Sequence, residues 1–132
     1  LHFMLGLTVF TLVWLRLLLK VTRPTPRIEP KPPAWQTGLA HLMHWALYLF
    51  MIVMPLLGWL VTSAKGNQVM FYGFDLPLLV SEDKALARQI QDWHEWGGTL
   101  GYWLIGLHAL AGLYHHYVVR DNTLLRMMPK RN

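Results

Sequence analysis

The feature that most constrains this chain is a set of three long apolar stretches within 132 residues. Residues 1–19 contain one charged side chain, Arg16, and residues 39–62 contain none. The third stretch, 92–119, has polar ends and an apolar centre at 100–113. About 20 apolar residues in a helix are enough to cross a hydrocarbon core of about 30 Å. We therefore predict an all-α integral membrane bundle, with three transmembrane helices in this chain.

The composition excludes most soluble functions. Charged residues make up 14% of the chain and hydrophobic residues 54%, whereas a soluble domain carries about 25% charged residues. The absence of cysteine excludes disulfides, iron–sulfur clusters and thiol nucleophiles. The formal net charge of +5 does not indicate nucleic-acid binding, because the basic residues lie between apolar runs rather than on one face. Membrane lipid is the expected surrounding, and seven tryptophans are typical of its interfaces.

The polar segments divide one domain, 1–132, into spans and connections. We predict a linker at 19–38, a loop at 63–91 and a tail at 120–132, and we take Ser81 as the possible N-cap of an amphipathic patch. Lysine and arginine are concentrated in the linker and the tail, at Lys20, Arg23, Arg27, Lys31, Arg120, Arg126, Lys130 and Arg131. The loop balances its basic residues with acidic ones. The positive-inside rule therefore places the linker and the C-terminus in the cytoplasm, and the loop outside.

Histidines at matching depths form the main functional pattern. His2 and His94 begin two spans that run in the same direction from the outer side, which is the geometry for two axial ligands on one haem iron. His108 follows His94 by 14 residues, about 21 Å along a helix and within roughly 40° of the same face. Gly101 lies midway and would leave room between two cofactors. Imidazole ligands without cysteine suit haem iron.

Other residues in the spans permit more than one interpretation. Arg16 shares a helix face with His2 and is expected either to pair with a haem propionate or to extend to the membrane surface. His41 and His44 suit an interfacial position, although depth alone leaves a pairing of His44 with His108 open.

His115 continues the line through residues 94, 101 and 108 at the end of the third span. It is a candidate contact for a bound ligand, with His116 a weaker one.

Several short motifs resemble one known family. They are Leu1-His2, Arg16 to Leu19, Thr37 to His41 with His44, Trp93-His94-Glu95, Gly101-Tyr102, Ile105 to Ala109, His115-His116-Tyr117 and Asp121 to Met127. Together they resemble the bacterial cytochrome b561 family, which are small di-haem, quinone-linked membrane cytochromes. The likeness is strongest to members that oxidise superoxide and pass the electron to ubiquinone.

The resemblance implies one-electron transfer by two b-type haems in the bacterial inner membrane. It implies that His2 and His94 share the outer haem. The family has four transmembrane helices, and we expect a preceding helix, absent from these residues, to supply the histidine that pairs with His108. His115 matches a position near the family's quinone site.

The favoured function is therefore oxidation of superoxide at the outer side with reduction of ubiquinone. Lys65 or Arg88 would guide the superoxide anion. Depth places the quinone near His115 and Arg16, but a quinone site near the outer haem remains open. The alternatives are a cytochrome b subunit that serves a partner dehydrogenase or hydrogenase, and a membrane anchor whose histidines are structural. The oligomeric state is left open.

Overall fold

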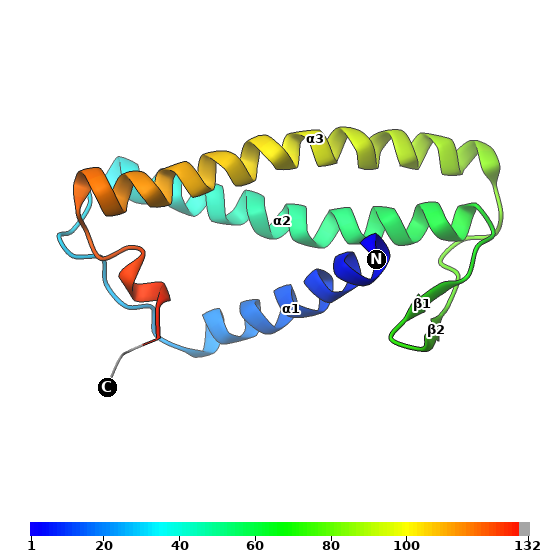
Figure 1. Ribbon diagram of the computed structural model, residues 1–132, viewed down its shortest axis with the longest axis horizontal. Coiled ribbons are helices and arrows are strands. Elements are labelled where there is room, and N and C mark those ends of the chain that lie inside the picture. Colours follow the sequence, from blue (N-terminus) through cyan, green and yellow to red (C-terminus); the bar gives the residue numbers. More distant parts are fainter. Residues whose placement is uncertain (130–132) are drawn as a thin grey trace.

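A computed structural model describes residues 1–129 and is built mainly of three helices (Figure 1). The elements in chain order are α1 (His2–Thr22), α2 (Ala34–Ala64), β1 (Val69–Phe71), β2 (Phe74–Leu76), α3 (Lys84–Tyr114), the π-helical turn η1 (His115–Val119) and the 3-10 turn η2 (Leu125–Met127). The predicted all-α class is confirmed, with one small hairpin added. Helices α1 and α2 extend past their apolar stretches, so the chain between them is limited to residues 23–33.

Helix α2 is the centre of the bundle. It runs alongside α3 for most of its length and also packs against α1, which starts beside the C-terminal half of α2 and diverges from it towards the linker (Figure 1). Glycines on α3 allow a close approach to α2: a Cβ added at Gly97 would lie 2.6 Å from Met54 Sδ, and one at Gly101 would lie 2.3 Å from Phe50 Cζ. Small residues at such contacts are typical of membrane helices.

The apolar side chains of the helices point mostly outwards. Helices α1 and α2 are long and apolar enough to cross a membrane, yet only 11% and 17% of their most apolar 18-residue windows are buried. The core helix of a soluble protein would be mostly buried, so these exposed apolar faces fit contact with lipid. Helix α3 does not meet the same criterion, because its first turns are charged and its apolar part is interrupted by glycines and His108. It has 31 residues, as α2 does, and lies beside it, so a bilayer crossed by α2 is crossed by α3 as well.

One end of the bundle, here called the hairpin end, is covered by residues 65–83 (Figure 1). Strands β1 and β2 pair antiparallel, and Tyr72 and Gly73 connect them with φ angles of 47° and 82°. Two positive φ values in a two-residue turn match the right-handed twist of the strands. The Tyr72 hydroxyl shares a 3.0 Å hydrogen bond with Thr8 Oγ1, which ties the hairpin to α1. The sequence predicts a polar loop for this segment, and the structure forms a hairpin within it.

The N-cap predicted for the amphipathic patch was wrong by two residues. Asp83, not Ser81, caps α3: its carboxylate accepts hydrogen bonds of 3.1 Å from the backbone N–H groups of Ala85 and Leu86. Both residue types are good caps. Asp83 takes the position because its own backbone N–H donates to the Ala64 carbonyl at 2.8 Å, which joins the start of α3 to the end of α2.

The opposite end, here called the tail end, is held together by side-chain bonds between the tail and the linker. Asn122 Oδ1 accepts from the Glu29 backbone N–H at 2.8 Å, and Asn122 Nδ2 donates to the Arg27 carbonyl at 3.3 Å. The Arg126 guanidinium donates to the Pro26 carbonyl. These bonds close the linker over the end of α3. Lys130 and Arg131, which contributed to the predicted orientation, lie outside the described residues.

The contact at Gly101 yields a prediction about stability. We expect Gly101→Ala to destabilise the bundle by about 1–3 kcal/mol, because the new methyl group must displace the Phe50 ring. Gly106→Ala is the matched control on the same helix: nothing lies within 4 Å of its Cβ position, and alanine favours a helix. Thermal unfolding in detergent measures both. Equal effects of the two substitutions would contradict the packing argument.

Candidate functional site

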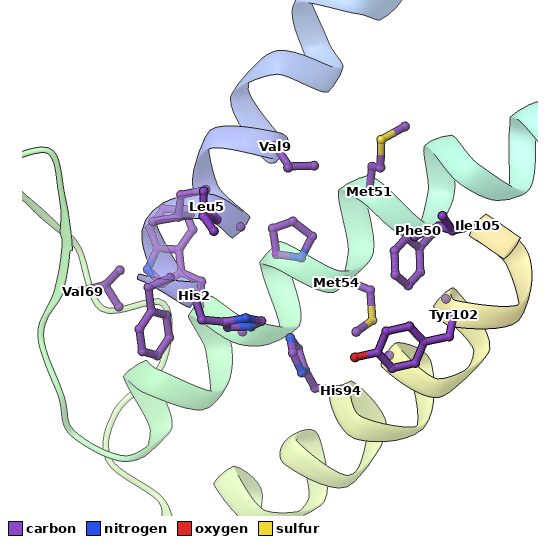
Figure 2. A pocket seen from close by; sticks show the side chains of 18 residues that line it. His2, Leu5, Val9, Phe50, Met51, Met54, Val69, His94, Tyr102 and Ile105 are labelled. Atoms are coloured by element: carbon purple, nitrogen blue, oxygen red, sulfur yellow. The ribbon is translucent and has the colours of Figure 1, made fainter. Parts of the chain in front are cut away.

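His2 and His94 come together in the structure. His2 lies in the first turn of α1 and His94 lies inside α3, and their ring centroids are 5.9 Å apart with an interplanar angle of 76°. Figure 2 shows the two rings pointing toward one another from their separate helices. The equal depth of His2 and His94 inferred from the sequence thus corresponds to two rings that lie next to each other. This spacing is compatible with two imidazole ligands on one metal.

An apolar cavity of about 330 Å³ adjoins this pair (Figure 2). Its lining comes from α1, α2 and α3 and includes Leu5, Val9, Phe50, Met51, Met54, Gly58, Gly98, Tyr102 and Ile105. Gly58 lies beside the imidazole, since a Cβ there would lie 3.5 Å from His94 Nε2. Sequence reasoning missed Gly58, because its position relative to His94 depends on how α2 packs on α3.

A second histidine pair lies further along α3. The rings of His44 and His108 have centroids 5.6 Å apart and an interplanar angle of 74°. The sequence had left this pairing open and had favoured a preceding helix as the source of the partner for His108. Gly101 is buried between the two pairs, seven residues, or about 10 Å of rise, from each α3 histidine. The space on its open side is filled by Phe50.

Basic side chains gather near the second pair. Arg16 and Lys20 of α1 lie close enough to His44 to act on it electrostatically. The Lys20 ammonium also lies over Trp45 and Tyr48, 5.5 Å and 5.1 Å from the ring centroids. Arg16 therefore lies near the depth of His44 and His108.

Three basic residues converge at the hairpin end. Lys65 follows α2, Lys84 begins α3 and Arg88 lies one turn later, and together with Ala87 they line one surface hollow. Arg88 precedes His94 by six residues, about 9 Å along the helix. The sequence had singled out Lys65 and Arg88, and the fold adds Lys84 to the same cluster.

His115 is hydrogen-bonded to Asp121, a residue to which the sequence analysis gave no role. After η1, Arg120 adopts a left-handed conformation at φ 58° and reverses the chain. The reversal brings Asp121 Oδ2 to 2.5 Å from His115 Nδ1. The Asp121 side chain is 1% exposed, and its other oxygen accepts from the Thr123 backbone N–H at 2.9 Å. In the sequence, His115 and Asp121 are only near neighbours after the third span, and nothing in the sequence indicates the turn that brings their side chains together.

The environment of Asp121 favours its ionised form. Burial raises the pKa of this carboxyl, but the hydrogen bonds from Thr123 and His115 outweigh burial and hold the pKa below its ordinary value of 3.8. Asp121 is therefore a carboxylate at neutral pH, enclosed in protein and bonded to the only histidine that its geometry reaches among the described residues.

This environment predicts how acid affects stability. Because the folded-state pKa of Asp121 is depressed, its contribution is present above 3.8 and is lost as the pH falls through the lower folded-state value. We expect Asp121→Ala to cost about 1–3 kcal/mol at neutral pH. The difference from wild type should shrink as the pH drops below 3.8. Denaturant unfolding at several pH values measures this, and a difference that is constant with pH would refute it.

The number of potential ligand side chains that lie together bears on which metal could bind. Among residues 1–129, no cluster of three or more histidine, aspartate or glutamate side chains is placed to hold a metal ion. Zinc sites use three or four protein ligands. A pair of histidines fits an iron whose remaining ligands come from a porphyrin.

Comparisons with known proteins agree with this chemistry. The chain is 41% identical over 130 residues to "Probable superoxide oxidase CybB" of Yersinia pestis, an alignment that covers 98% of this chain and 74% of the relative. It is 42% identical, with the same coverage, to "Cytochrome b561 homolog 1" of Escherichia coli (strain K12). "Cytochrome b561 homolog 2" of that strain is 28% identical over 138 residues, covering 98% of this chain and 70% of the relative. The profile of the family described as "Prokaryotic cytochrome b561" matches residues 1–130. The chain therefore belongs to the prokaryotic cytochrome b561 family of membrane electron-transfer proteins.

Proposed function

We propose that this protein oxidises superoxide at the hairpin end and reduces ubiquinone at the tail end, in the bacterial inner membrane. The observation that carries the proposal is the His2–His94 pair, two imidazoles from separate helices beside an apolar cavity. The similarity to a relative named as a probable superoxide oxidase supports the choice of donor. The excess of basic residues in the linker and tail supports a cytoplasmic location for that end.

The residues present fit the haem b that the family implies. His2 and His94 would hold its iron, the apolar lining would exclude water from the macrocycle, and Gly58 would leave space beside His94 Nε2. When bound, haem b supplies a one-electron redox couple. The chain's own contribution is to hold the imidazoles in position and to set the polarity around them.

For a second haem, we propose that His108 would be one of the residues that hold the iron. Arg16 would offer its guanidinium to a propionate, a match that allows two parallel hydrogen bonds. Two sources of the other ligand are consistent with this proposal. His44 is already adjacent at 5.6 Å between ring centroids, and the family resemblance implies a histidine on a preceding helix.

These ligands can be tested by haem content. We expect His2→Ala and His94→Ala each to remove the same haem, and His108→Ala to remove the other, because low-spin b-type iron needs both axial imidazoles. A pyridine haemochrome assay gives haem per protein, and reduced-minus-oxidised spectra show which haem is lost. His41→Ala is the matched control: it removes an imidazole one turn before His44, and its ring is in neither of the two histidine pairs of the described residues.

The His44→Ala variant decides whether His44 or a histidine on a preceding helix is the second ligand of this haem. Loss of the second haem in both His44→Ala and His108→Ala would make His44 the partner. Loss in His108→Ala alone would place the partner on a preceding helix of the longer protein. Full retention of both haems in the His2→Ala and His94→Ala variants would overturn the proposed ligand pair.

The overall reaction has a defined balance. Two superoxide anions lose one electron each and become dioxygen, while ubiquinone takes up two electrons and two protons and becomes ubiquinol. The cluster of Lys65, Lys84 and Arg88 would raise the local concentration of the superoxide anion. The loop as a whole carries little net charge, so the attraction would come from this cluster and not from the loop as a whole.

Electrostatic guidance predicts a dependence on salt. We expect the rate of superoxide-driven reduction to fall as ionic strength rises, because salt screens exposed charges beyond about 10 Å at 0.1 M. Lys65→Ala and Arg88→Ala should lower the rate at low salt and flatten its dependence on salt. Lys31→Ala, at the tail end, is the control and should behave as wild type.

Stopped-flow spectroscopy with no partner protein measures these rates. A rate independent of salt in every variant would exclude guidance by the cluster. No reduction by superoxide in the wild type would favour the alternative function, electron exchange between a partner dehydrogenase or hydrogenase and quinone.

A further inference from the structure

Tyr72, in the turn of the hairpin, adopts a backbone conformation that is unfavourable for its residue type. Its φ angle of 47° lies in the left-handed region, which a bulky residue rarely occupies. The first position of such a turn usually holds glycine, asparagine or aspartate. Within the described residues Tyr72 is 62% exposed, so burial of the ring does not account for tyrosine here. What distinguishes Tyr72 from the usual turn residues is its hydroxyl group, which reaches α1.

The hydrogen bonds around Thr8 have a defined direction. The Thr8 hydroxyl donates its single hydrogen to the Met4 carbonyl at 2.6 Å. Tyr72 must therefore donate to Thr8 Oγ1 across the 3.0 Å contact. Among residues 1–129, this is the only hydrogen bond between α1 and another element. Through Met4, the two bonds connect the hairpin to the first turn of α1, which contains His2.

The hairpin segment is also attached to α2. Trp59 Nε1 donates to the carbonyl of Pro77, the residue that follows β2, at 3.0 Å. Helix α2 in turn packs along α3, which carries His94. The segment therefore joins the helix of His2 to the pair of helices that positions His94 (Figure 1).

The same segment forms part of the cavity beside the two imidazoles. Val69 of β1 is 3% exposed and lines this cavity together with His2 and Trp59 (Figure 2). Thr8 follows His2 by six residues, which places it about 9 Å along α1 and roughly 120° around it. A contact on this separate face restricts rotation of α1 about its axis, and that rotation sets the direction of the His2 side chain.

We propose that Tyr72 is a positioning residue: by attaching the hairpin to Thr8, it holds the His2 imidazole opposite His94. This inference rests on the proposed function, in which these two imidazoles hold the outer haem. Asparagine or glycine at position 72 would form the turn more easily but would lose the attachment to α1. The unfavourable backbone at Tyr72 is therefore retained for the bond that its hydroxyl group makes.

The first measurement is hydrogen–deuterium exchange of the full-length protein in detergent. Tyr72→Phe removes only the hydroxyl group, and we expect amides in residues 2–9 to exchange about 3–10-fold faster, the effect of losing one hydrogen bond. Thr8→Val should give the same increase, and the double variant no further increase, because both substitutions remove the same bond. Thr8→Ser keeps the acceptor and should behave as wild type. Additive effects of the two single substitutions, or no effect of either, would overturn the proposed attachment.

The second measurement is the midpoint potential of each haem, from a spectroscopic redox titration of the same protein. We expect Tyr72→Phe and Thr8→Val to shift the potential of the haem that is lost in His2→Ala and to leave the other haem unchanged, because axial ligation sets the potential. A contribution to overall stability alone would lower the unfolding temperature without this selective shift. No shift, or equal shifts of both haems, would overturn the positioning of His2.

Tyr72→Asn separates the attachment from the stability of the turn itself. Asparagine favours this turn, so the hairpin forms more easily while the bond to Thr8 is lost. We expect the same selective shift as in Tyr72→Phe, and wild-type behaviour of Tyr72→Asn would overturn the inference. Tyr117→Phe is the matched control, because it removes the hydroxyl group of an exposed tyrosine at the tail end, away from the hairpin. Retention of both haems in His2→Ala would instead overturn the proposed function, and the exchange measurement would still test the attachment.

Discussion

The structure depends on one constraint: inside a hydrocarbon layer, every backbone N–H and C=O group must find its partner within the protein. The helices α1, α2 and α3 meet this requirement along their own lengths. Their outward faces then become apolar, and residues such as Trp14, Leu42 and Trp103 are left exposed to lipid. Irregular backbone is confined to the two ends, where the hairpin and the tail–linker bonds satisfy its polar groups.

This constraint also determines where the chemistry can lie. A polar side chain inside the bundle needs a specific partner, and helices offer such partners at fixed intervals along the chain. His94 and His108 occupy one face of α3, and each has another imidazole nearby, from His2 in one case and from His44 in the other. The helix backbone thus acts as a rigid support that separates two candidate redox sites along the direction of the bilayer.

The contact between α2 and α3 links the stability of the bundle to these sites. Met54 and Phe50 fill the space that Gly97 and Gly101 leave open, and both side chains also line the cavity beside His94. Packing that holds the helices together therefore also shapes the apolar surroundings of the imidazoles. A larger residue at Gly101 would disturb both, because the same ring of Phe50 serves the two functions.

The sequence alone determined the fold class, because long apolar stretches allow few alternatives. His2 and His94 were placed at one depth because each begins a span and the two spans run in the same direction. Gly101 and His108 followed from the helical period along α3. Only the tertiary structure placed Gly58 next to His94 and His44 next to His108. It also placed Lys84 in the cluster with Lys65 and Arg88. The Tyr72–Gly73 turn was not predicted from the sequence. Asp121 reaches His115 only because Arg120 reverses the chain. Periodicity reports positions along one helix, whereas contacts between helices and across turns depend on packing distances and backbone angles that no single stretch of sequence encodes.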